Sequence, residues 1–292
     1  MAANSPHGAA RSGLALAHPA DRRAPVMRKD AMKPLKLSGP LYALYAGKLR
    51  KQVAAGPLPR HIGLIMDGNR RWARQMGLAH PGLGHKHGAD HVEEVLSWCE
   101  LLGIRHVSVF VCSTENLTGR SEAEVAFLMQ VIETVAAENL ARPDARWQLH
   151  IAGSLDLLPD STAHALKQAV EATRECITGA HLTLAIGYGG RQEVIDAIRD
   201  LLYEQAAVGR TLDEVADALS ADDLTRHLYT AGQPDPDLVI RTSGEQRMSN
   251  FLLWQSAYSE LYFCDTNWPA FREIDFLRAV RSFAARQRRF GS

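Results

Sequence analysis

Short apolar runs alternate with longer amphipathic segments from about residue 58 to the end of the chain. We expect strands in the short runs, at 61–66, 106–112, 147–152, 182–186, 238–241 and 261–264. We expect helices in the longer segments, at 84–102, 121–139, 160–178, 191–207, 213–219 and 273–288. Strands separated by helices of this length need crossover connections, which make neighbouring strands parallel. The pattern predicts one α/β domain with a mostly parallel six-stranded sheet flanked by helices on both sides.

The first 35 residues differ from the rest of the chain. They are rich in Ala, Pro, Arg and Ser without a sustained apolar period, so residues 1–35 are predicted to be a disordered tail. A basic start with few acidic residues resembles an organelle transit peptide. A solvated tail or an upstream start codon is the simpler interpretation, because Met27 and Met32 offer later starts. A helical lead-in is expected at 36–57, before the main domain at 58–292.

Composition excludes two classes of protein. The 33 Lys and Arg residues balance 33 Asp and Glu residues, so no basic excess supports binding to nucleic acid. A membrane-spanning protein is not expected either. The longest uncharged stretch, 177–190, contains four glycines and is shorter than the roughly 20 apolar residues that a spanning helix needs. The four cysteines are scattered without a CxxC pair, which favours free thiols in a reducing compartment, and we predict the cytoplasm.

Polar residues follow three of the expected strands, in the segments 67–72, 113–116 and 241–249. Ligands of open parallel sheets bind beyond the carboxyl ends of the strands. The three segments would bring carboxylates, two Asn, hydroxyls and four Arg to one edge of the sheet. Arg side chains bind phosphate oxygens through paired hydrogen bonds, and Gly68 allows a phosphate to approach the backbone. This edge is therefore predicted to bind a polyanionic ligand.

The usual phosphate and metal motifs are missing. The chain has neither GxxxxGK[ST] nor a GxGxxG after the first strand, which argues against ATP, GTP and dinucleotides. The glycine-rich segment 187–190 is interpreted as a tight turn in preference to a phosphate cradle. His85, His87 and His91 lack the HExxH pattern, and residues two apart face different sides of a helix. We therefore expect no zinc there, and expect His85 alone to donate to a phosphate.

The segment 61–73 (HIGLIMDGNRRWA) resembles the opening signature of the cis-prenyltransferases, the undecaprenyl diphosphate synthase family. Segments at 84–86, 113–116, 189–191, 238–255 and 260–263 resemble its later motifs, in the same order. The resemblance covers about 58–291. It implies an enzyme that elongates an allylic diphosphate with isopentenyl diphosphate, forms a Z double bond and uses Mg²⁺. It also implies the parallel α/β fold, not the helical fold of the trans-prenyltransferases.

Within this family, the segments 41–45, 113–117 and 229–238 resemble the actinobacterial short-chain branch, the (2Z,6E)-farnesyl diphosphate synthases. A fifteen-carbon product made from geranyl diphosphate is therefore expected. Two alternatives stay open: a long-chain enzyme that supplies a cell-wall carrier lipid, and a non-catalytic scaffold subunit. The chain departs from the long-chain pattern at several positions, namely Arg70, Pro81, Leu117, Gln246 and one extra residue within 117–120.

The resemblance also assigns residue roles. Asp67 and Asn116 would be the catalytic residues. Asp67 would bind Mg²⁺ with Glu260 as the second metal ligand. Family usage gives Asn116 the removal of the proton, but a neutral amide is a poor base, so we expect Asn116 to orient the substrate. Arg241, Arg247 and Ser249 would hold isopentenyl diphosphate. The substrate-binding residues implied in full are Gly68, Asn69, Arg70, Arg71, Trp72, His85, Ser113, Thr114, Glu115, Arg120, Arg241, Arg247, Met248, Ser249 and Arg289.

Two further expectations concern assembly and product length. The segment 289–291 resembles the family's C-terminal RxG, which implies a homodimer in which Arg289 reaches the partner's active site. The lipid-like product implies at most a peripheral contact with the inner face of the cell membrane. Val111 stands where long-chain members commonly have Ala, so we expect it to limit chain length, helped by Phe127, Leu128 and Ile132.

Overall fold

The computed structural model describes residues 39–140, 145–176 and 178–286. The expected disordered tail at 1–35 and Arg289 therefore lie outside the described residues. Within them, helix α1 (Pro40–Ala54) occupies most of the expected lead-in segment.

The sheet is parallel throughout. Its six strands are β1 (His61–Ile65), β2 (His106–Ser113), β3 (Gln148–Ala152), β4 (His181–Tyr188), β5 (Leu238–Arg241) and β6 (Glu260–Phe263). They are ordered β3-β4-β2-β1-β5-β6. Strand β1 lies inside the sheet and is buried along its whole length, which explains its nearly continuous apolar sequence. The predicted α/β class and sheet are confirmed.

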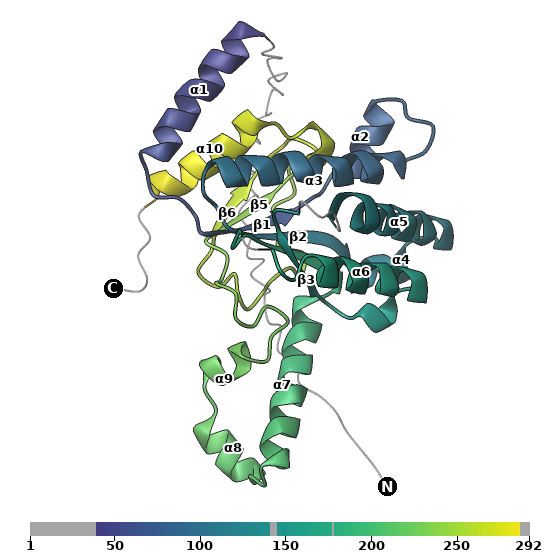
Figure 1. Ribbon diagram of the computed structural model, residues 1–292, viewed down its shortest axis with the longest axis vertical. Helices are drawn as coiled ribbons and strands as arrows, with labels where there is room; N and C mark the ends of the chain where they lie inside the picture. The colour runs from purple at the N-terminus through teal and green to yellow at the C-terminus, as the bar shows by residue number, and fades with distance from the viewer. Residues whose placement is uncertain (1–38, 141–144, 177, 287–292) are drawn as a thin grey trace, which may run out of the picture. The chain divides into compact units, whose positions relative to one another are not determined.

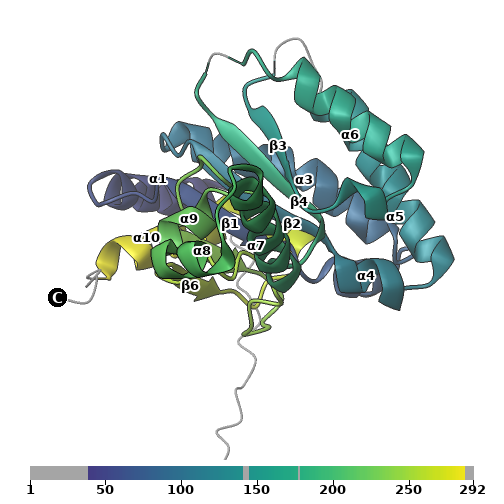
Figure 2. The same ribbon diagram turned by 90° about the horizontal axis from the view of Figure 1, so that it is seen from below.

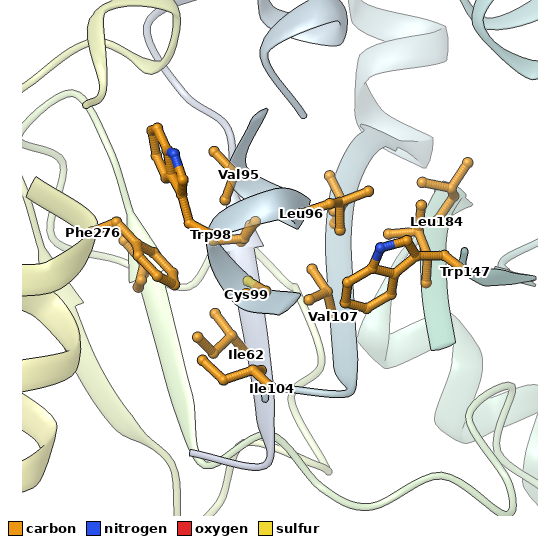
Figure 3. Close-up of a cluster of buried hydrophobic side chains, with 14 of the residues drawn as sticks. Ile62, Val95, Leu96, Trp98, Cys99, Ile104, Val107, Trp147, Leu184 and Phe276 are labelled. Carbon is orange, nitrogen blue, oxygen red and sulfur yellow. The ribbon is translucent and has the colours of Figure 1, made fainter. Parts of the chain in front are cut away.

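One face of the sheet carries the larger core. Helices α3 (Leu83–Leu101), α5 (Glu122–Val135), α6 (Asp160–Ala172) and α10 (Glu273–Ala285) lie on this side, and α1 packs along α10 (Figures 1 and 2). Alternate strand residues such as Ile62 and Val107 point into this core and meet Trp98 and Cys99 of α3 and Phe276 of α10 (Figure 3). Helix α5 lies within the segment 121–139 where a helix was expected, and its residues Leu128, Met129, Val131 and Ile132 are buried.

The other face departs from the expected helical cover. Helix α7 (Gly190–Ala207) begins beyond the end of β4 and projects away from the sheet, and α8 (Leu212–Ala218) and α9 (Ala221–Thr225) lie beside it (Figure 1). A smaller core including Tyr188 and Phe251 covers part of this face. Nearer the amino ends of the strands the face is polar: His61 Nε2 lies 2.9 Å from Ser108 Oγ, and Thr183 donates to Gln233. Hydrogen bonds there take the place of an apolar helix face.

Two short helices follow strand ends. A helix start directly after Gly68 was expected, whereas a helix after β2 was not. Helix α2 (Asn69–Gln75) follows β1, and α4 (Thr114–Gly119) follows β2 with the Ser113 side chain as its N-cap. Both are too short to show an apolar period. The remaining elements are a π-helical segment (Ala136–Leu140) and 3-10 turns at Leu155–Leu157 and Trp268–Ala270. None of the helices in the described part of the chain is long and apolar enough to cross a membrane.

Candidate active site

A cavity of about 380 Å³ opens at the carboxyl ends of β1, β2 and β5 and extends between the sheet and helices α3 and α5. Its mouth is polar and its interior is apolar. The polar residues that line it include Asp67, Asn69, Arg70, His85, Ser113, Asn116, Arg120, Arg241, Arg247 and Ser249. The apolar residues include Val92, Leu96, Val111, Leu128, Val131, Ile132 and Leu184. The structure thus brings together most of the site residues that the sequence predicted.

Asp67 and Arg241 form the centre of the mouth. Asp67 follows β1, and its Oδ2 accepts a hydrogen bond of 2.7 Å from Nη2 of the buried Arg241 at the end of β5. Its Oδ1 accepts the N–H of Gly68 at 2.7 Å. Burial by itself would raise the pKa of Asp67. The hydrogen bond and the charge of Arg241 lower it by more than burial raises it, so the pKa of Asp67 lies below the usual value. Asp67 is therefore a charged carboxylate at the cavity mouth, paired with Arg241.

Carboxylates of the protein lie beside the other arginines at the mouth. Arg247 donates to Glu245 at 2.5 Å, and Arg71 lies 3.6 Å from the same carboxylate. Arg70 donates to Glu124 at 3.2 Å. Sequence reasoning did not assign roles to Glu124 or Glu245. The sequence held one local indication for Glu124. It stands three residues after Ser121, the N-cap of α5, which is the spacing of a capping box at a helix start.

His85 of α3 and Asn116 of α4 both line the cavity. Burial lowers the pKa of His85 to about 4, and the nearby Arg120 and Arg70 add to the effect, so the ring is neutral at pH 7. Asn116 accepts a hydrogen bond from Arg120 at 2.5 Å and donates to Ser113 Oγ at 2.8 Å. Arg120 therefore reaches the cavity despite the extra residue before it.

Val111, Leu128 and Ile132 line the apolar interior, as the chain-length prediction requires. Phe127 does not line it, and its ring lies 5.6 Å from that of His80. Helix α5 turns this side chain toward the loop before α3, because Phe127 directly precedes the buried Leu128 and so faces a different side of the helix.

Other predicted binding residues surround the cavity without lining it. Trp72 packs edge-on against His87, and Met248 packs against the smaller core. Thr114 and Glu115 are hydrogen-bonded to each other, and Glu115 also accepts from Asn250. Gly68 has φ +98°, and a Cβ there would lie 2.4 Å from Asn267 Oδ1, so this position requires glycine.

Glu260 lies at the opposite edge of the sheet from Asp67. It begins β6 and is level with Leu238, whereas Arg241, the partner of Asp67, is level with Phe263. Three residues of strand separate these levels by about 10 Å. Glu260 is instead paired with Arg286, which follows α10. A single chain therefore does not bring the two expected metal ligands together.

The residues around Asp67 fit a magnesium ion that also binds phosphate. Among the described residues, no group of three or more His, Cys, Asp or Glu side chains could hold a metal by itself. Magnesium commonly binds through one or two carboxylates, water and substrate phosphates. Asp67 supplies a carboxylate at the mouth, and the buried Oδ1 of the neighbouring Asn69 has no hydrogen-bond partner. The Asp67 carboxylate beside Arg241 suits that mode of binding.

Comparisons with known proteins agree with this geometry. Residues 65–291 match the family model described as "Putative undecaprenyl diphosphate synthase". An isoprenyl transferase of Streptomyces fradiae is 76% identical over 252 residues, which cover 86% of this chain and 97% of the relative. A (2Z,6E)-farnesyl diphosphate synthase of Mycolicibacterium smegmatis is 46% identical over 260 residues, covering 88% of this chain and 98% of that protein.

A solved structure shares the fold. Lavandulyl diphosphate synthase from Lavandula x intermedia, in complex with dimethylallyl diphosphate, superposes with a TM-score of 0.74 at 32% identity and covers 80% of this chain and 99% of that chain. The family model spans the strands that build the cavity, from the end of β1 onward. The chain belongs to the undecaprenyl diphosphate synthase family, the cis-prenyltransferases.

Proposed function

We propose that the protein condenses isopentenyl diphosphate with an allylic diphosphate to give a short Z-prenyl diphosphate, with geranyl diphosphate as the starter and a (2Z,6E)-farnesyl product. The observation that carries the proposal is the cavity itself, which joins an arginine-lined mouth to an apolar interior. Diphosphates carry their charge at one end and an apolar chain at the other. The named relatives, an isoprenyl transferase and a farnesyl diphosphate synthase, support the same reaction.

Two groups of residues would hold the two diphosphates. Arg241, Arg247 and Ser249 lie together at the end of β5 and in the loop after it, and would bind isopentenyl diphosphate, which keeps its diphosphate. Arg70, Arg71, His85 and the backbone N–H groups at the start of α2 would bind the allylic diphosphate. Holding both substrates at the distance of reaction supplies much of the acceleration. The charged groups at the mouth stabilise the pyrophosphate as it leaves.

Asp67 would hold Mg²⁺ together with diphosphate oxygens. When bound, the ion supplies Lewis-acid stabilisation of the departing pyrophosphate. Asn116 has both of its amide atoms engaged, by Arg120 and by Ser113. Because a neutral amide is also a poor base, we assign Asn116 to orienting the substrate, and pyrophosphate or water accepts the proton.

We also propose a homodimer. Helices α7 and α8 and the turn between them expose large apolar side chains, as expected of a surface that meets another protein. They include Ile195, Tyr203, Val208 and Leu212. Glu260 is paired with Arg286. Arg286 stands only three residues before Arg289, which was expected to reach a partner. Glu260 would then bind the metal in the partner's site.

We also propose that the protein is cytoplasmic. The four cysteines are free, which supports that location.

Turnover with defined substrates tests the proposal. The purified protein is incubated with radiolabelled isopentenyl diphosphate, Mg²⁺ and dimethylallyl, geranyl or (E,E)-farnesyl diphosphate, and the products are separated by chain length. We expect mainly a fifteen-carbon product from geranyl diphosphate. Products beyond about thirty carbons would instead support the long-chain enzyme, and a folded protein without turnover would support the scaffold.

A further inference from the structure

The loop after β5 holds an unusual backbone conformation. Ser249, Asn250 and Leu252 have φ of 51°, 64° and 43°, in the left-handed region that residues other than glycine rarely adopt. Such a conformation costs free energy and persists only where the surrounding structure imposes it. The question is which contacts hold this segment and what the segment positions.

The loop positions Arg241. Nη1 of Arg241 donates to the carbonyl oxygen of Arg247 and to Ser249 Oγ, both at 2.6 Å, while Nη2 of Arg241 donates to Asp67. The guanidinium is almost fully buried, so its direction is set by these acceptors. A shift of residues 247–249 would therefore turn Arg241 away from Asp67 and move two other residues of the proposed isopentenyl diphosphate site.

Asn250 connects this loop to two other strand ends. Its Oδ1 accepts the N–H of Arg191 at 2.9 Å, and its backbone oxygen accepts the N–H of Gly190 at 2.8 Å, both beyond the end of β4. Its Nδ2 donates to Glu115 Oε1 at 3.2 Å, just beyond the end of β2. A Cβ at Gly189 would lie 2.9 Å from Nδ2, so the glycine allows this close approach.

We propose that Asn250 is a positioning residue for the isopentenyl diphosphate site, held by Glu115 and the turn after β4, and that it acts through Ser249 and Arg241. Neither Asn250 nor Glu115 lines the cavity, so neither is placed to touch the substrate. The glycine-rich turn at 187–190 thus supports the loop, in agreement with its interpretation as a turn. This inference rests on the proposed function, because it names the substrate whose binding the loop controls.

Three variants test it. Asn250→Gly keeps the left-handed backbone accessible and removes only the side chain. Asn250→Asp keeps the acceptor for the N–H of Arg191 but places a second carboxylate beside Glu115. Adding Glu115→Gln to this variant restores the hydrogen bond between positions 115 and 250, with the side chain at position 115 now the donor and the side chain at position 250 the acceptor. Gln192→Ala is the matched control, because Gln192 lies close by in the first turn of α7, is exposed and donates a hydrogen bond to Asp196.

We expect Asn250→Gly to raise the KM for isopentenyl diphosphate about tenfold while the KM for geranyl diphosphate changes less than twofold. Asn250→Asp should be impaired at least as much, and the added Glu115→Gln should recover at least half of the loss on a logarithmic scale. Gln192→Ala should match wild type. Calorimetric titration of isopentenyl diphosphate should show the same order of affinities.

Three results would overturn the inference. They are wild-type KM values in Asn250→Gly, equal increases for both substrates together with a lower Tm, and no recovery in the double variant. In each case an active wild-type enzyme leaves the proposed function standing. A wild-type protein that neither binds nor turns over isopentenyl diphosphate would instead refute the proposed function, and this inference with it.

Discussion

The two ends of the parallel sheet differ in how their polar groups are held. At the carboxyl end, charged side chains surround an open cavity, and all four non-glycine residues with positive φ in the described ranges lie there, within 243–252. At the amino end, the buried His61 lies between Pro234 O at 2.6 Å and Ser108 Oγ at 2.9 Å. The buried Asp237 accepts the backbone N–H groups of Arg60 and His61 there.

This difference separates function from stability. Strain and like charges cost free energy, so they are expected where a ligand or a reaction requires them. Groups paired with the backbone at the amino end contribute to folding instead. The comparison predicts that equivalent substitutions at the two ends will affect different measurements.

Paired carboxylate variants should give the largest effect. Asp67→Asn removes the charge at the cavity mouth and should lower kcat by at least about 10³-fold, which is about 4 kcal/mol of transition-state stabilisation. Asp237→Asn at the amino end should lower Tm and leave kcat within about threefold. Steady-state kinetics with Mg²⁺ and thermal unfolding measure both. If Asp67→Asn kept more than a tenth of wild-type kcat, the proposed mechanism would be wrong.

Mixing variants sharpens the comparison, because within one chain Asp67 and Glu260 lie at opposite ends of the sheet. If Glu260 serves the partner's site, a heterodimer of an Asp67→Ala chain and a Glu260→Ala chain contains one complete site. Refolding the two inactive variants together should then restore activity to about a quarter of wild type, since half of the dimers are mixed and each has one working site. If the mixture stays as inactive as its components, Glu260 does not act across a dimer.

A change of product, not of rate, is expected inside the cavity. Val111→Ala removes two methyl-sized atoms from a wall that a growing chain must pass, so the product distribution should shift to longer chains. Chromatography of the products from geranyl diphosphate measures the shift. Val53→Ala, in the core between α1 and α10, serves as a control that should reduce stability and leave chain length unchanged. An unchanged distribution in Val111→Ala would show that this residue does not limit growth.

The smallest effect concerns two histidines whose pKa values are both lowered to about 4, His85 at the mouth and His61 at the amino end. Diphosphate binding would offset the charges of Arg120 and Arg70 and should raise the pKa of His85 by about one pH unit. The pKa of His61 should not change. NMR titration with and without pyrophosphate measures both, with His85→Gln used for assignment. Equal shifts, or none, would contradict the proposed anion site.

Burial of His61 also predicts how stability depends on pH. Its pKa is lower in the folded state than in the unfolded state, so the unfolded chain binds more protons in acid. The stabilisation is complete above the ordinary pKa of about 6.5. It is lost progressively as the pH falls from there toward 4, which urea unfolding at several pH values would show.

Local pattern was sufficient for the sheet and for most of the cavity mouth. Apolar runs separated by long amphipathic segments allow little except a parallel sheet. Asp67, Asn116 and Arg241 could be grouped because each lies at or just after the end of a strand. The same rule would have placed Glu260 correctly, because it precedes the predicted strand at 261–264 and so belongs to the amino end. Its expected partnership with Asp67 came from the family resemblance alone.

Other features depended on tertiary structure, because they join residues far apart in sequence. Pairing of Arg70 with Glu124, or of Asn250 with Glu115, requires separate strand ends to meet at hydrogen-bond distance, which no periodicity encodes. The projection of α7 likewise depends on what covers the second face of the sheet, and polar groups there replaced the expected helix. The sequence by itself determined the parallel sheet and the chemistry at its carboxyl edge, since both follow from local order along the chain. Only the tertiary structure decided which charges face one another, because that depends on how the strand ends are brought together.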